Sequence, residues 1–128
     1  MNSWLAVLYV GLGGFLGAAA RYGLSLATAG LSMVIPYGTL LANIIGCFLI
    51  GVILSLATQS DAVTPGARLF LATGLCGGFT TMSSFVFELA SLTRAGDFAV
   101  AALYLSVTLI GSIVFFYVGM MLVQLLRT

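Results

Sequence analysis

The stretch Gly-Leu-Cys-Gly-Gly-Phe-Thr-Thr-Met-Ser-Ser-Phe-Val-Phe-Glu, residues 74–88, lies inside a segment that is otherwise typical of a membrane-spanning helix. Its two adjacent glycines and four hydroxyl residues are unsuited to a lipid-facing helix. Irregular backbone at membrane depth is tolerated only where protein or a water-filled path covers it. We therefore expect the backbone to break near Gly77 and Gly78, between Gly77 and Thr80, and the break to mark an ion or substrate site.

The composition is that of an integral membrane protein. Of 128 residues, 62% are hydrophobic and 5% are charged, whereas a soluble domain carries roughly 25% charged residues. The chain has no histidine, and its acids are Asp61, Glu88 and Asp97, so it lacks a general base and a carboxylate pair. We expect no enzyme and no nucleic-acid partner. Cys47 and Cys76 fall in apolar spans and are interpreted as buried thiols.

Hydrophobic runs predict one domain, residues 1–128, with four membrane helices. The spans are predicted at about 4–28, 38–58, 67–92 and 98–125. Turn residues mark the connections: Pro65 is suited to begin the third span, Gly96 to end it, and Asp97 to cap the fourth. The predicted fold class is thus an all-α membrane protein whose third helix is broken at mid-membrane.

The arginines are evenly divided between the two ends of such a bundle. Four spans put both termini on one side, with Arg68 and Arg127, while Arg21 and Arg94 lie on the other. The positive-inside rule needs an excess on one side, and none exists here. Two interpretations remain open: the chain inserts in both orientations and forms an antiparallel homodimer, or one orientation dominates for reasons outside the charge balance.

Several polar residues lie where a membrane helix should be apolar. Arg21 shares one helix face with Gly13 and Gly17, and it either reaches the interface or borders a water-filled vestibule. Asn43 either bonds a neighbouring helix or donates to a permeating anion. Glu88 is the only acid well inside a span, so it should pair, bind protons or face water.

Hydroxyl groups gather on the third and fourth spans. Tyr104, Thr108 and Ser112 recur every four residues and share one face. The third span adds Thr80, Thr81, Ser83 and Ser84, with Met82 and Phe85 beside them. Neutral donors suit an anion that must enter and leave, and a Phe ring has a positive edge. Freed carbonyls at the break suit a hard cation such as Na⁺. The alternative is a tight helix crossing whose hydroxyls bond their own backbone.

Three motifs in order resemble the Fluc (CrcB) family of bacterial fluoride channels, and the resemblance spans the whole chain. They are Gly-Gly-x-x-Gly-x-x-x-Arg-Tyr at 13–22, Pro-x-Gly-Thr-Leu-x-x-Asn-x-x-Gly at 36–46, and Thr-Gly-x-x-Gly-Gly-x-Thr-Thr-x-Ser-x-Phe at 73–85. One departure is Met82, because the family typically has a phenylalanine there. A thioether is polarizable but has no ring edge, so Met82 and Phe85 form an unequal pair.

The resemblance implies a fluoride channel of the bacterial inner membrane that exports fluoride passively. It implies an antiparallel homodimer in lipid with two pores and a central structural Na⁺, bound by the backbone carbonyls of Gly77 and Thr80 from both subunits. The fluoride pathway implied by the resemblance and the polar pattern comprises Arg21, Asn43, Met82, Ser83, Ser84, Phe85, Tyr104, Thr108 and Ser112, with Glu88 following it.

Two other functions fit the same composition. A small dual-topology exporter of cationic drugs would use a membrane carboxylate as a shared proton and substrate site, and Glu88 is the only candidate. A subunit that assembles with other proteins and transports nothing itself is the third possibility.

Overall fold

The computed structural model describes residues 1–127, and every regular element within that range is a helix. Four segments are long and apolar enough to cross a membrane: Ser3–Thr28, Tyr37–Gln59, Pro65–Arg94 and Phe98–Leu126. The first, second and fourth are the continuous helices α1 (Ser3–Thr28), α2 (Tyr37–Gln59) and α6 (Phe98–Leu126). All four lie within two residues of the predicted ends, which confirms a multi-pass membrane protein.

The third segment is assembled from several shorter elements. It begins with α3 (Pro65–Arg68) and continues through a π-helical stretch, η1 (Leu69–Cys76), into α4 (Gly77–Phe79). Thr80 and Thr81 are extended, with ψ of 155° and 123°, and α5 (Met82–Arg94) follows. We call these two extended residues the joint. Pro65 begins the segment as predicted, behind a Thr64 cap whose hydroxyl accepts from the Ala67 N–H at 3.1 Å.

The break predicted between Gly77 and Thr80 is only partly confirmed, because Gly77 and Gly78 remain helical, whereas Thr80 is extended and the interruption continues to Thr81. Gly78 instead serves a close helix contact: a Cβ there would lie 2.6 Å from the carbonyl oxygen of Gly14 on α1. The two threonines after the glycines take the extended conformation, which β-branched residues adopt readily. The glycine pair therefore correctly indicated which region of the third segment is irregular, but not which residues leave the helix.

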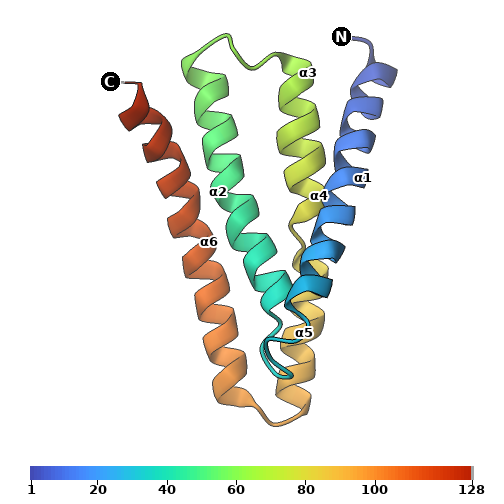
Figure 1. Ribbon diagram of the computed structural model, residues 1–128, viewed down its shortest axis with the longest axis vertical. Helices are drawn as coiled ribbons and strands as arrows, with labels where there is room; N and C mark the ends of the chain where they lie inside the picture. Colours follow the sequence, from blue (N-terminus) through green and yellow to red (C-terminus); the bar gives the residue numbers. More distant parts are fainter. Residues whose placement is uncertain (128) are drawn as a thin grey trace.

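Two helix pairs carry most of the packing. Figure 1 shows α6 beside α2, and α1 beside the third segment. Gly13 and Gly17 are buried on the face of α1 that meets η1 and α4, as their spacing predicted. Small residues allow this approach because lipid supplies no hydrophobic drive between membrane helices.

The connections leave both termini at one end of the bundle (Figure 1). The α2–α3 connection lies at that end, and the α1–α2 and α5–α6 connections lie at the other. Gly96 turns the chain between α5 and α6 with a φ of +82°, a conformation that favours glycine. Asp97 occupies the position before α6, but its side chain makes no capping hydrogen bond.

Candidate functional site

The joint is fastened to α2 by one buried amide. Asn43 Nδ2 donates to the Thr81 carbonyl at 3.1 Å, and the Thr81 N–H donates to Asn43 Oδ1 at 2.8 Å. The side chain thus replaces both partners that a helix would have supplied to Thr81. The sequence left two interpretations of Asn43 open, and the structure contains the first of them, a hydrogen bond to a neighbouring helical segment.

At the joint, two N–H groups that would donate to helical carbonyl groups donate to side chains instead. In a continuing α-helix the Thr81 N–H would donate to Gly77, and the Ser84 N–H to Thr80. The first donates to Asn43 instead, and the second donates to Thr81 Oγ1 at 3.2 Å as an N-terminal cap of α5. The carbonyl oxygens of Gly77 and Thr80 therefore lose their helical donors.

Arg21 lies against the same region from α1. Its Nε donates to the Gly78 carbonyl at 3.3 Å, one turn before α5 begins, and the side chain is half-buried. The guanidinium therefore packs on the third segment rather than extending freely to the membrane interface. This contact follows from the face that Arg21 shares with Gly13 and Gly17.

A cavity of about 250 Å³ opens beside the joint, and we call it the joint cavity. Its ten lining residues come from α2, the joint, α5 and α6, and none of them is charged. They are Asn43, Cys47, Ile50, Thr80, Thr81, Met82, Phe85, Thr108, Leu109 and Ser112. Thr108 is 4% exposed, and its hydroxyl oxygen has no hydrogen-bond partner within residues 1–127.

Unpartnered buried hydroxyls are rare, because each costs about 1–3 kcal/mol when desolvated. Thr108 lines a cavity that has room for water or a small ion. Thr80 behaves differently, since its hydroxyl bonds back to the Cys76 carbonyl at 3.0 Å. The polar face expected for the fourth span is therefore buried at Thr108. The Thr80 hydroxyl instead bonds its own backbone, as expected for a tight helix crossing.

An aromatic pair closes the joint cavity on the α5 side. Phe85 is 3% exposed, and its ring meets that of Tyr104 edge-on, with centroids 5.1 Å apart. Tyr104 is itself fixed, because its hydroxyl donates to Glu88 Oε2 at 2.6 Å. Thr39 Oγ1 donates to the other carboxylate oxygen, Oε1, at 2.7 Å. Both oxygens of this membrane acid are thus satisfied by neutral donors from α2 and α6.

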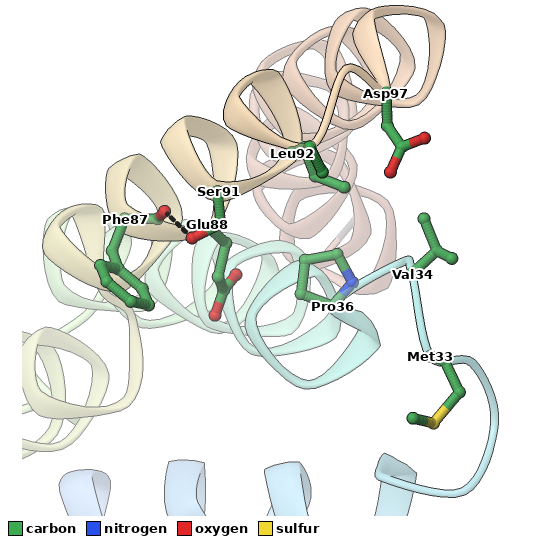
Figure 2. A pocket seen from close by; sticks show the side chains of 9 residues that line it. Met33, Val34, Pro36, Phe87, Glu88, Ser91, Leu92 and Asp97 are labelled. Atoms are coloured by element: carbon green, nitrogen blue, oxygen red, sulfur yellow. Dashed lines mark hydrogen bonds between the residues drawn. The ribbon is translucent and has the colours of Figure 1, made fainter.

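Glu88 also borders a second cavity, of about 350 Å³, near the α5–α6 connection. Figure 2 shows its carboxylate pointing away from α5, with Pro36, which precedes α2, to one side and Asp97 at the far edge. The Ser91 hydroxyl near it bonds back to the Phe87 carbonyl at 2.9 Å. We call this space the Glu88 cavity. Phe85 lines the joint cavity and contacts Tyr104, which in turn bonds to Glu88.

The structure brings together most of the residues singled out from the sequence. Asn43, Met82, Phe85, Thr108 and Ser112 line the joint cavity, and Tyr104 joins it to Glu88. Met82 is 66% exposed in the single chain.

Besides Tyr104, three predicted pathway residues lie outside the lining of the joint cavity. Ser83 is exposed, and its hydroxyl lies 3.2 Å from Thr81 Oγ1. Ser84 is half-buried in the first turn of α5, and Arg21 contacts the preceding helix. These residues border the joint from other sides.

Sequence reasoning missed two residues of the site. Thr39 is 6% exposed and lies four residues before Asn43, so it shares that face of α2. Cys47 lies four residues after Asn43 on the same face and lines the joint cavity. The spacing alone could have identified both once Asn43 was recognised.

Known proteins resemble this chain over almost its whole length. The family described as CrcB-like protein, Camphor Resistance (CrcB), matches residues 8–120. The "Fluoride-specific ion channel FluC" of Chlorobium phaeobacteroides (strain BS1) is 47% identical over 122 residues, 95% of each chain. Proteins of the same name from Prosthecochloris aestuarii and Anaeromyxobacter sp. (strain K) are each 46% identical over 119 residues, covering 92–94% of the chains compared.

Proposed function

Since the chain belongs to the CrcB-like protein family, we propose that it is a fluoride-selective ion channel that allows passive fluoride export across the bacterial inner membrane. The relatives at 46–47% identity are named fluoride-specific ion channels. The further support comes from the chemistry of the joint cavity and its aromatic border.

The observation that carries this proposal is the uncharged joint cavity, which is lined by Thr108, a residue whose buried hydroxyl has no hydrogen-bond partner within residues 1–127. A neutral O–H donor can bind fluoride without the full positive charge that would trap it. Ser112 adds a second hydroxyl to the same lining. Buried Phe85 presents a ring at the border, and an aromatic edge carries partial positive charge that favours an anion.

The proposed path runs from the joint cavity past Phe85 and Tyr104 to the Glu88 cavity. Glu88 acts here as a positioning residue: it fixes the Tyr104 hydroxyl, and Tyr104 in turn supports the Phe85 ring. Met82 contributes a flexible thioether to the entrance in place of a second ring. Ser83, Ser84 and Arg21 would border the path from outside the joint cavity.

The proposal extends to an antiparallel homodimer with two pores, in which the joint lies at mid-membrane. The even division of arginines supports dual insertion. A structural Na⁺ fits the joint, because the carbonyl oxygens of Gly77 and Thr80 have lost their helical donors and hard cations take oxygen ligands. One chain offers two such oxygens, so a partner related by symmetry would complete the set.

Fluoride efflux from liposomes containing only the purified protein tests the function. We expect efflux well above that of empty liposomes, and chloride efflux no faster than in empty liposomes. Equal fluoride and chloride rates would contradict selectivity, and no flux of either ion would contradict a channel. Because no other protein is present, activity would also exclude a subunit that needs a transporting partner.

The drug-exporter alternative makes a different demand on Glu88. A shared proton and substrate site must exchange protons, whereas both oxygens of Glu88 here accept from hydroxyls, as suits an ionised carboxylate. Uptake of a cationic dye driven by a proton gradient, and lost in Glu88→Gln, would support the exporter. We expect no such uptake.

A further inference from the structure

The joint cavity contains two sulfur-bearing side chains. Cys47 is a free, half-buried thiol on α2, and Met82 contributes a thioether from the first residue of α5. Thiolate and thioether sulfur are soft ligands that favour Cu⁺ and similar cations over Na⁺, Mg²⁺ or Ca²⁺. The fold brings these two side chains to one cavity although they lie 35 positions apart in the sequence.

Local contacts explain why both sulfurs reach this cavity. Cys47 lies one helical turn after Asn43 on the same face of α2. Asn43 bonds both backbone polar groups of Thr81, and Met82 is the next residue. The fastening of the joint to α2 therefore also places Met82 near the turn that carries Cys47.

The cavity has further features of a binding site. Thr108 lines the same cavity, and its hydroxyl oxygen is buried and unpartnered within the described part of the chain. Cys47 and Ser112 also border a neighbouring open cavity of about 430 Å³ with Ile113, Phe116 and Tyr117. A small ion can thus approach Cys47 from two sides.

We propose that the joint cavity binds a soft monovalent cation of the Cu⁺ and Ag⁺ class through Cys47 Sγ and Met82 Sδ. As the metal–thiolate bond forms, the thiol releases its proton to water, so the total charge is conserved. The bound ion occupies the space beside Thr108 and obstructs the passage of fluoride. This obstruction rests on the proposed function, whereas the binding does not.

Silver binding to the full chain in detergent tests the site directly. The purified protein is mixed with silver nitrate in chloride-free buffer and desalted, and the retained silver is measured by elemental analysis. We expect about one silver ion per chain, at most a tenth of that in Cys47→Ser, and at least tenfold weaker binding in Met82→Leu.

Cys76→Ala is the matched control, because Cys76 is 0% exposed and lines a different cavity. It should retain silver like the unaltered chain.

The outcomes separate the site from the channel. Undiminished silver in Cys47→Ser, or loss of silver in Cys76→Ala, would overturn the proposal, and unaltered affinity in Met82→Leu would remove the second ligand and overturn it as stated. If Cys47→Ser does not fold, Cys47→Ala and protection of the thiol by silver against a disulfide reagent replace it.

The flux arm measures the fractional inhibition of fluoride efflux by silver, each variant relative to its own uninhibited rate. We expect at least tenfold inhibition of the unaltered chain and of Cys76→Ala, but little inhibition of Cys47→Ser. Retained silver without inhibition would support the site and place it off the fluoride path. Retained silver in a protein that conducts no fluoride would support the site and refute the proposed function.

Discussion

Replacing Asn43 by alanine tests how much the joint depends on one side chain. The substitution removes two hydrogen bonds, from Nδ2 to the Thr81 carbonyl and from the Thr81 N–H to Oδ1. Asn43 is only 9% exposed, so both backbone groups of Thr81 lose partners in a largely apolar setting. We expect the unfolding free energy to fall and fluoride flux to fall with it.

The size of the effect follows from two limits. Hydrogen bonds between membrane helices contribute about 0.6 kcal/mol each on average, which gives a lower limit of about 1.2 kcal/mol for two. Leaving the N–H and C=O groups buried without partners would cost about 1–3 kcal/mol each, or up to about 6 kcal/mol. The joint cavity of about 250 Å³ borders both residues and admits water, which replaces part of the loss. We therefore expect a loss of about 1.2–3 kcal/mol.

Reversible unfolding of the detergent-solubilised protein by added SDS measures this free energy. Ser55→Ala is the matched control, because Ser55 is 2% exposed on the same helix and its hydroxyl accepts only within α2, from Gln59 Nε2 at 3.0 Å. The control should lose less than about 1 kcal/mol. Equal losses in the two variants, or unaltered stability in Asn43→Ala, would refute the idea that this amide holds the joint.

Three further substitutions test the aromatic border and the helix packing. Phe85→Ile removes the ring that meets Tyr104 at 5.1 Å and should reduce fluoride efflux at least tenfold; normal efflux would take Phe85 out of the path. Tyr104→Phe removes the 2.6 Å hydrogen bond to Glu88 and should lower the unfolding free energy by about 1.5–3 kcal/mol, a loss that should shrink when Glu88→Gln is the background. Gly13→Leu would force a side chain into the backbone of η1 and should abolish a monodisperse elution peak, whereas Gly23→Leu, with open space around it, should elute normally.

The helices themselves were predictable from the sequence. Long apolar runs broken by Pro65, Gly96 and similar turn residues determine where a chain can cross a membrane, because uncovered backbone polar groups are too costly in lipid. Spacing along one helix also placed Gly13 and Gly17 on a packed face, since helical periodicity is a local property.

The sequence located the irregular region less well than it located the helices. Glycine is permissive, so the Gly77–Gly78 pair was the natural place to expect the break. Close contact with α1 holds that pair in a helix, and the interruption falls on Thr80 and Thr81 instead. The decision depends on Asn43, which is 38 positions away from Thr81 and supplies the partners that the interruption needs.

The sequence by itself thus determined that this protein lies in a membrane, where its four helices run, and which kinds of polar group they contain. Only the tertiary structure decided which polar groups find a hydrogen-bond partner. The carboxylate oxygens of Glu88 accept from Thr39 and Tyr104, whereas the Thr108 hydroxyl has no partner within residues 1–127. The physical reason is that helical periodicity specifies a face within each element. Pairing across elements depends on how the glycine contacts set the helices against one another.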